Sequence, residues 1–205
     1  MPRKPRIEYE GAFYHVITRG NQRQQIFRDA ADFQKYHQFL TIYKNRTRCR
    51  VYAYALMNNH VHLLLETADV PLSRIMQGLN QTYTMFFNRK YRTVGHLFQG
   101  RYKAILCDRV AYLLGLIKYI HHNPVRAKAA QSPDDYIWTS HHAYTGKNNP
   151  LGLTVPLRSR SWAATVPTSA MIVSSELSII RHPLISYYAC YHFCQEAAVG
   201  ALTGC

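Results

Sequence analysis

Short apolar stretches bounded by turn residues recur along the first half of this chain. Aromatic and β-branched residues are frequent in them, and such residues favour β-strands because they pack well on a half-buried pleated surface. We therefore expect strands over the following segments: 12–18, 50–57, 60–66 and 97–106. The pair Asn58-Asn59 separates the second segment from the third, which predicts that these two strands form a hairpin.

Between these strands, apolar residues recur at the three- and four-residue spacing of an amphipathic helix. Asp29 is a suitable N-cap for a helix over residues 30–46, with its apolar side marked by Phe33, Tyr36 and Leu40. Pro71 is expected to open a second helix that extends to about residue 90.

A final helix is expected from Asp108, as its N-cap, to Asn123, because Pro124 would stop it. The order strand, helix, strand, strand, helix, strand is that of the ferredoxin-like fold. In this α+β fold an antiparallel sheet carries its helices on one face. We therefore predict this βαββαβ fold with an additional helix at its C-terminal end.

The patterns weaken after Trp138, and residues 148–205 show few helix caps and no sustained periodicity. We expect a domain over residues 1–146, in which residues 1–10 form a basic arm, followed by a tail of undetermined structure over 147–205. The alternating Cys190, His192 and Cys194 in this tail match no common zinc-binding framework.

The net charge of the chain is +14 and its isoelectric point is about 9.8. Residues 1–147 hold 22 Lys and Arg against 9 Asp and Glu, so nearly all of the excess lies in the expected domain. A basic excess of this size favours a polyanionic partner, and nucleic acid is the partner we expect.

Five scattered cysteines do not form the pattern of a disulfide framework, which indicates reduced thiols in a cytoplasm. The basic N-terminus lacks the apolar stretch of a signal peptide, and no apolar run has the length of a membrane span. We expect a cytoplasmic protein without a membrane partner.

The strongest chemical signal is the pair His60 and His62, whose side chains lie on one face if residues 60–66 form a strand. Tyr119 and Asn123 are four residues apart in the final helix and therefore also share a face. Two imidazoles and an amide oxygen suit a hard or borderline ion such as Mg²⁺ or Mn²⁺.

A tyrosine beside such an ion could attack phosphorus and form a phosphotyrosine, a chemistry that cuts and rejoins nucleic acid. Tyr112 lies on a similar helical face, but the residue four positions after it is Leu116, which is a core residue type rather than a ligand. We therefore expect Tyr119 to be the nucleophile, and we expect His121 and His122 to be solvated near the helix end.

Alternating basic side chains around Tyr102 predict a groove that follows a single-stranded backbone and stacks bases. The residues that we expect to contact DNA phosphates are Arg3, Lys4, Arg6, Arg19, Arg23, Arg101, Lys103 and Arg126. Nothing in their pattern indicates sequence specificity.

Three motifs, residues 59–64, 95–104 and 119–127, together with residues 11–21, resemble the single-tyrosine HUH transposases. They are most similar to the REP-associated tyrosine transposases of bacteria. The resemblance covers about residues 1–146 and ends near Asn148.

The resemblance implies metal-dependent cleavage of single-stranded DNA, through a 5′-phosphotyrosine, at hairpin-forming palindromic repeats. It implies that His60, His62 and Asn123 bind the metal and that Tyr119 is the nucleophile. It also implies a bacterial protein associated with the nucleoid. Family members occur as dimers and as monomers, so a homodimer stays open.

Two other functions remain open. Ferredoxin-like sheets with exposed aromatic residues also bind nucleic acid without cutting it. A domesticated protein that binds repeats without moving them is a further alternative. The set His60, His62, Tyr119 and Asn123 favours the enzyme, because a binder does not need these residues.

Overall fold

The computed structural model describes residues 7–107, 113–147 and 151–154. The chain divides into two compact units, residues 1–158 and 159–205, and every described residue belongs to the first unit. Four sequence predictions lie outside the described residues: the basic side chains of the arm (Arg3, Lys4 and Arg6), the Asp108 cap, Tyr112, and the tail from residue 155, including its Cys and His residues.

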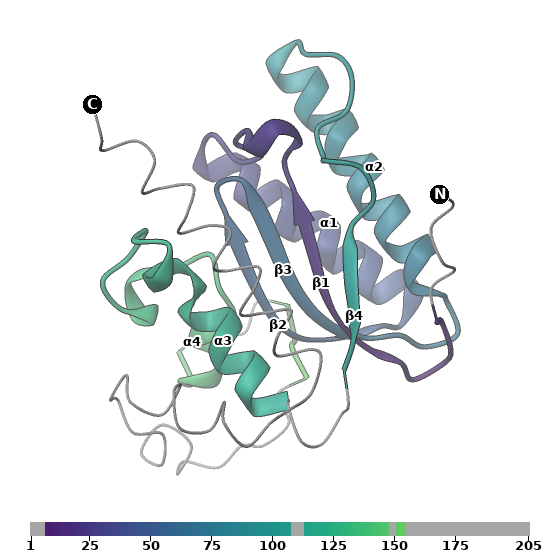
Figure 1. Ribbon diagram of the computed structural model, residues 1–205, viewed down its shortest axis with the longest axis vertical. Coiled ribbons are helices and arrows are strands. Elements are labelled where there is room, and N and C mark those ends of the chain that lie inside the picture. Colours follow the sequence, from purple (N-terminus) through teal and green to yellow (C-terminus); the bar gives the residue numbers. More distant parts are fainter. Residues whose placement is uncertain (1–6, 108–112, 148–150, 155–205) are drawn as a thin grey trace, which may run out of the picture. The chain divides into compact units, whose positions relative to one another are not determined.

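The centre of the described unit is a four-stranded antiparallel sheet (Figure 1). Its strands are β1 (Phe13–Arg19), β2 (Arg50–Met57), β3 (His60–Glu66) and β4 (Lys103–Leu106). They lie in the order β2-β3-β1-β4, so the two central strands are the first and third of the chain. This sheet order and the α+β character confirm the predicted fold class.

Helices cover both faces of the sheet. α1 (Ala30–Thr47) and α2 (Leu72–Tyr91) lie behind the sheet in Figure 1, and α3 (Leu113–Arg126) lies in front of it against β2. The remaining elements are the short helices η1 (Asn21–Arg23), η2 (Pro133–Asp135) and α4 (His141–Tyr144).

The alternation of β1 divides its side chains between these two layers. Tyr14 and Val16 belong to the hydrophobic core under α1 and α2. The intervening residues, among them His15 and Ile17, point to the opposite face because successive side chains of a strand alternate. Both sets are buried, so the face toward α3 is also packed.

The strand predicted over residues 97–106 is shorter than expected, because only Lys103–Leu106 pairs as β4. Phe98 forms a single isolated bridge to Gly20, and the chain then turns away at Gly100, whose φ is +63°. An extended strand cannot continue through this left-handed conformation, which glycine adopts readily.

Pro124 does not end the last helix at Asn123 as predicted, because α3 continues to Arg126. A proline removes its own N–H from the helix, but the residues after it can still donate to earlier carbonyls. The backbone N–H of Ala127 donates to the carbonyl of Asn123 at 2.9 Å, which adds the final turn.

The outer edge of β2 is covered by the segment 138–140. The Leu56 N–H donates to the carbonyl of Trp138 at 2.9 Å, and the Ser140 N–H donates to the carbonyl of Tyr54 at 3.0 Å. Thr139 forms a bridge with Ala55 between these two bonds. The sheet therefore continues by one short antiparallel contact beyond its named strands.

Residues 151–154 also pack on the sheet unit, which therefore extends beyond residue 146. Leu151 and Leu153 are buried in the hydrophobic core, and the N–H of Thr154 donates to the carbonyl of Val51 at 3.0 Å. Within the described ranges, no helix combines the length and the apolar character needed to span a membrane.

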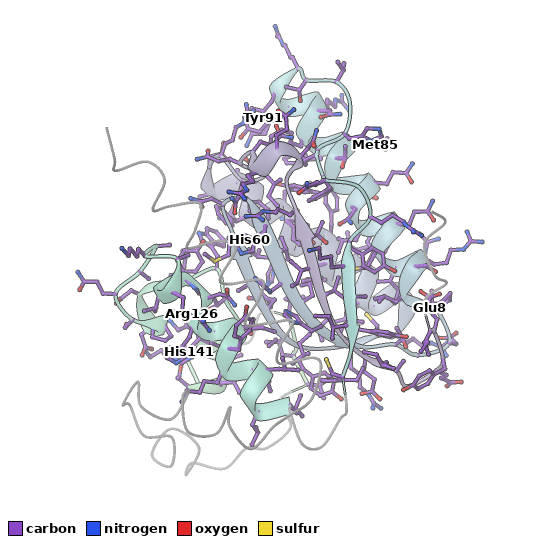
Figure 2. All side chains as sticks on the ribbon, viewed as in Figure 1. Glu8, His60, Met85, Tyr91, Arg126 and His141 are labelled. Atoms are coloured by element: carbon purple, nitrogen blue, oxygen red, sulfur yellow. The ribbon has the colours of Figure 1, made fainter. Side chains whose placement is uncertain are left out.

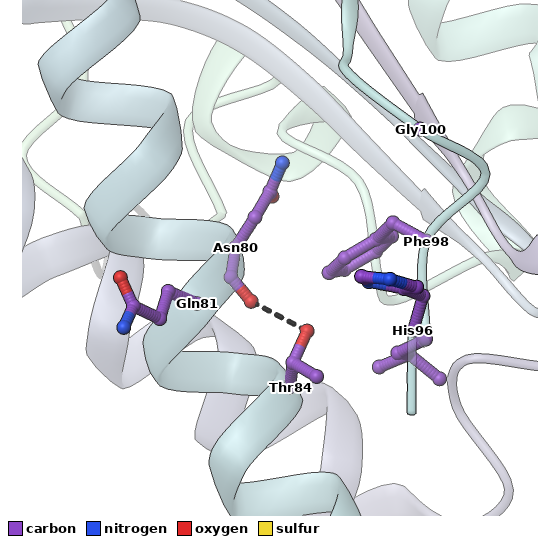
Figure 3. Close-up of a pocket in the computed structure, with 7 residues that line it drawn as sticks. Asn80, Gln81, Thr84, His96, Phe98 and Gly100 are labelled. Carbon is purple, nitrogen blue, oxygen red and sulfur yellow. Dashed lines mark hydrogen bonds between the residues drawn. The ribbon is translucent and has the colours of Figure 1, made fainter. Parts of the chain in front are cut away.

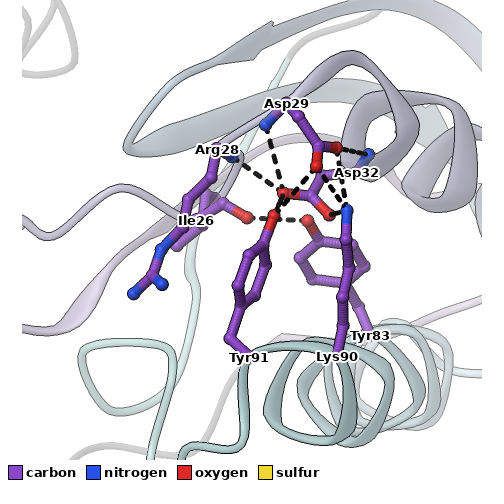
Figure 4. Close-up of polar contacts among 7 residues, drawn as sticks. All are labelled: Ile26, Arg28, Asp29, Asp32, Tyr83, Lys90 and Tyr91. Atoms are coloured by element: carbon purple, nitrogen blue, oxygen red, sulfur yellow. Dashed lines mark hydrogen bonds and ion pairs between the residues drawn. The ribbon is translucent and has the colours of Figure 1, made fainter.

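An ionic cluster joins the start of α1 to the end of α2 (Figure 4). Asp32 is fully buried, and its carboxylate accepts hydrogen bonds from the ammonium of Lys90 and the hydroxyl of Tyr91, each at 2.7 Å. Lys90 also reaches the carboxylate of Asp29, the predicted cap of α1, at 2.7 Å. The Asp29 carboxylate accepts a hydrogen bond from the Asp32 N–H, which confirms the cap.

We expect Asp32→Ala to lower the free energy of unfolding by about 3 kcal/mol, because it removes the buried carboxylate that Lys90 and Tyr91 share. Urea denaturation measures this change. Asp69→Ala is the control, because Asp69 is exposed, and it should change the free energy by less than about 0.5 kcal/mol. A loss in Asp32→Ala no larger than in this control would contradict the prediction.

Candidate active site

The pairing register of β1 with β3 brings three histidines to the face of the sheet that α3 covers. His60 lies opposite Arg19, His62 lies opposite Ile17, and His15 lies opposite Leu64. Directly opposed residues of antiparallel strands point to the same face. The prediction that His60 and His62 share a face agrees with this register, and His15 joins them from the neighbouring strand.

His15 and His62 are in direct contact. The Nε2 atom of His15 lies 2.9 Å from the Nδ1 atom of His62, and both side chains are buried. Their rings are stacked, with 5.2 Å between the centroids. Burial lowers the pKa of His15 to about 3, so this ring is neutral at neutral pH. These two nitrogens can hydrogen-bond only if one of them carries a proton and the other accepts it.

His60 occupies the first position of β3, beside the hairpin turn (Figure 2). Its Nδ1 atom lies 2.6 Å from the amide oxygen of Asn59, so Nδ1 carries the proton and donates it. Burial, together with the nearby charge of Arg19, lowers the pKa of His60 to about 4. The His60 ring is 5.0 Å from that of His62 between centroids.

α3 places Tyr119 beside these histidines. The centroid of its ring lies 6.1 Å from that of His62 and 6.1 Å from that of His15. The guanidinium of Arg126, which is exposed on the same helix, lies 5.3 Å from the centre of the Tyr119 ring (Figure 2). A phenol, a guanidinium and three imidazoles therefore meet between α3 and the sheet.

Asn123, the proposed third metal ligand, is buried one turn after Tyr119. Its amide nitrogen donates to the carbonyl of Tyr119 at 3.1 Å, which leaves its amide oxygen as the atom that could bind a metal. In the described part of the chain, no hydrogen bond joins Asn123 to His60 or His62.

The described residues contain no group of three or more His, Cys, Asp and Glu that could hold a metal. A site here would therefore combine His60 and His62 with a different oxygen donor, as the sequence predicts with Asn123. The two histidines fit this role, because the Nδ1 atom of each already has a partner. Metal-binding histidines are usually oriented in this way, and each would then bind through Nε2.

α3 is attached to the edge of the sheet by a buried contact that the sequence did not indicate. The Nε2 atom of His121 lies 2.7 Å from the hydroxyl oxygen of Ser140. The same hydroxyl accepts a hydrogen bond from the N–H of Tyr54 on β2 at 2.9 Å. The prediction that His121 is solvated is wrong, because its side chain is only 1% exposed.

Apart from Arg126 on α3, the predicted phosphate-binding residues that the structure describes lie either on the strands of the site or beside them. Lys103 is exposed and lies opposite Ile17, in the same row across the sheet as His62. Arg19 is half-buried opposite His60. Arg101 is exposed in the loop before β4, and Arg23 is exposed at the end of the short helix η1.

His15 is the functional candidate that the sequence analysis did not single out, although residues 11–21 belong to the resemblance. A signal was present, because His15 is a polar residue inside an otherwise apolar strand. What could not be known was which strand β1 pairs with and in which register.

Residues 8–123 match the model of a protein family described as "Transposase IS200 like". The fold is similar to the structure of a REP-associated tyrosine transposase bound to a REP hairpin, with a TM-score of 0.60 and 15% sequence identity. The similarity covers 74% of this chain and 90% of that one. At this level of identity the similarity shows the fold alone.

A weaker similarity is to a protein of Deinococcus radiodurans R1 that is named as a transposase, with a TM-score of 0.42 and 18% identity. It covers 60% of this chain and 97% of that one. No curated protein matches the chain.

The buried neutral His15 predicts a loss of stability in acid. Its pKa in the folded state, about 3, lies below the ordinary value of 6.5, so the unfolded chain binds more protons between these values. The free energy of unfolding should therefore fall as the pH is lowered through this window. We expect His15→Gln to make this fall shallower by about 1 kcal/mol per pH unit between about pH 6 and 4.5.

Urea denaturation at several pH values measures both slopes. Equal slopes for wild type and His15→Gln would show that His15 is not a neutral buried group.

Proposed function

The chain belongs to the family of IS200-like transposases, and on this basis we propose that it cuts and rejoins single-stranded DNA with Tyr119 as its nucleophile. The observation that carries this proposal is the position of Tyr119 on α3, with its ring 6.1 Å from that of His62. Tyr119 on the helix α3 thereby lies near candidate metal ligands on the sheet, an arrangement that suits metal-assisted phosphoryl transfer.

In the proposed reaction, the phenol oxygen of Tyr119 attacks the scissile phosphorus, and the bond from phosphorus to the 3′ oxygen breaks. The phenol releases its proton and the leaving oxygen gains one, so the products are a 5′-phosphotyrosine and a free 3′-hydroxyl. Attack by a 3′-hydroxyl on the phosphotyrosine reverses the step and joins two ends. No external energy source is needed, because the phosphoester bond is exchanged.

A divalent ion such as Mg²⁺ or Mn²⁺, held by His60, His62 and Asn123, would supply positive charge at the scissile phosphate. The low pKa of His60 supports this role, because an imidazole must be neutral to bind a metal. Arg126 lies over the Tyr119 ring and is suited to hold a phosphate beside the nucleophile.

Hairpin DNA is the substrate that we propose. The protein of similar fold was solved with a REP hairpin, and the described part of this chain presents exposed basic residues around the same sheet. Lys103 begins β4, Arg101 lies in the loop before it and Arg23 ends η1, so these three residues could follow a DNA backbone beside the site.

We expect Tyr119→Phe to abolish the formation of a covalent protein–DNA adduct, because it removes the attacking oxygen and leaves the ring packing intact. The measurement is denaturing electrophoresis of labelled single-stranded hairpin DNA after incubation with the protein and Mn²⁺. Tyr9→Phe is the matched control, because Tyr9 is exposed and lies outside the site, and it should form as much adduct as wild type.

An adduct of equal yield in Tyr119→Phe would exclude Tyr119 as the nucleophile. Binding of hairpins by the wild-type protein without any adduct would favour the alternative function, a nucleic-acid binder that does not cut.

His15 is a positioning residue in this proposal. If a metal binds Nε2 of His62, the proton of that ring is on Nδ1, which then donates to Nε2 of His15 at 2.9 Å. His15 would thereby hold the His62 ring in the tautomer and orientation that metal binding needs. Its own burial keeps it neutral, so it can accept this hydrogen bond.

We expect His15→Leu to weaken Mn²⁺ binding by about 10- to 100-fold, because residues that orient a metal-binding histidine typically have effects of this size. Gln can still accept a hydrogen bond, so His15→Gln should lose less affinity. Isothermal titration calorimetry without DNA measures both. Wild-type Mn²⁺ affinity in His15→Leu would contradict the positioning role.

A further inference from the structure

A small pocket lies between α2 and the loop that precedes β4, outside the site described above. Its volume is about 150 Å³, and Figure 3 shows α2 side chains on one wall facing His96 and Phe98 on the other. The lining residues are Asn80, Gln81, Thr84, His96, Leu97, Phe98 and Gly100. A cavity of this volume accommodates a single six-membered ring.

The walls of the pocket are held by the protein itself. The carbonyl of Leu97 accepts the N–H of Asn21 at 2.8 Å, and the N–H of Gln99 donates to the carbonyl of Arg19 at 2.8 Å. Phe98 is 7% exposed and packs 6.3 Å from the ring of Tyr83 on α2. The loop that contains Leu97 and Gln99 is thus attached to the end of β1 at Arg19, the residue that lies opposite His60.

Asn80 gives the pocket an unsatisfied polar group. Within the described part of the chain, its amide oxygen Oδ1 is buried and accepts no hydrogen bond. The hydroxyl of Thr84, one turn later, donates to the backbone carbonyl of Asn80 at 2.7 Å and can still accept a bond from a ligand. A buried acceptor without a donor is costly. Because Oδ1 is closed to solvent, a ligand N–H reaches it only after the Asn80 amide rotates toward the pocket, and the bond so formed would relieve this cost.

The pocket is open at Gly100, just before two exposed basic residues in the chain. A side chain added at Gly100 would meet no atom within 4 Å, so this side is open to solvent. Arg101 and Lys103 follow directly in the chain, and both are exposed. A single strand whose phosphates contact these two residues would bring a base to the pocket.

We propose that this pocket binds one unstacked pyrimidine base of the single-stranded DNA. The inference rests on the proposed function and specifies a base-binding subsite for it. A pyrimidine offers one ring, an N–H donor for Oδ1 of Asn80 and a neighbouring acceptor for its amide nitrogen. Phe98 and His96 supply an aromatic wall for contact with the base.

The first test compares oligonucleotides of equal length, about 12 nucleotides, made only of thymidine or only of deoxyadenosine. We expect Asn80→Leu to weaken thymidine-oligonucleotide binding about fivefold, as loss of one hydrogen bond would, and to leave the adenosine oligonucleotide unaffected. Fluorescence anisotropy measures both. Gln77→Leu is the matched control, because Gln77 is an exposed amide on α2 that does not line the pocket.

Two results would overturn the proposal that the pocket binds a base and would leave the proposed function standing. One is equal affinity of Asn80→Leu and Gln77→Leu for the thymidine oligonucleotide, and the other is equal weakening of Asn80→Leu toward both oligonucleotides. Failure of the wild-type protein to bind either oligonucleotide would also overturn the pocket, whereas the proposed function fails only if hairpin DNA gives no covalent adduct with Tyr119.

A second measurement needs no variant and therefore does not depend on the folding of Asn80→Leu. Wild-type protein is photocrosslinked to a single strand that contains 5-iodouracil and is then digested with trypsin. Cleavage after Arg92 and Arg101 releases residues 93–101, which include His96 and Phe98. Crosslinks are expected in this peptide or in the peptide 75–89, which holds the α2 wall of the pocket, and crosslinks confined to any other peptide would overturn the proposal.

Discussion

The pairing of β1 with β3 is the constraint on which the rest of the candidate site depends. In this register Leu63 and Leu65 point into the core under α1 and α2, while His60 and His62 point toward α3. A shift of β3 by one residue would exchange its two faces and place the imidazoles in the core under α1 and α2. The apolar residues that stabilise the core therefore also orient the histidines.

Local patterns predicted most of the fold, because strands, helices and the Asp29 cap depend on residues close in sequence. Two predictions were wrong, the length of β4 and the end of α3, and in both cases backbone contacts that the local pattern does not show determine the outcome. β4 is short because the preceding loop binds the end of β1 and turns at Gly100, which the apolar pattern of residues 97–106 does not reveal. α3 passes Pro124 because later residues still find acceptors.

The candidate site was predictable in part. Period-two alternation places His60 and His62 together, but the distance from them to Tyr119 depends on how α3 packs on the sheet. That packing involves His121 and Ser140, which are 19 residues apart and carry no shared motif. His15 was missed for the same reason, since its partner His62 is 47 residues away. Such contacts become visible only with the tertiary structure.

The covered edge of β2 has a consequence for how copies of this protein meet one another. An open strand edge is a template onto which another chain can add, and this is a common route to aggregation. The segment 138–140 already occupies much of that edge in β2, and the strand at the other edge, β4, has only four residues and begins with a charged lysine. The described sheet is thus poorly suited to grow by the addition of a strand from another copy at either edge.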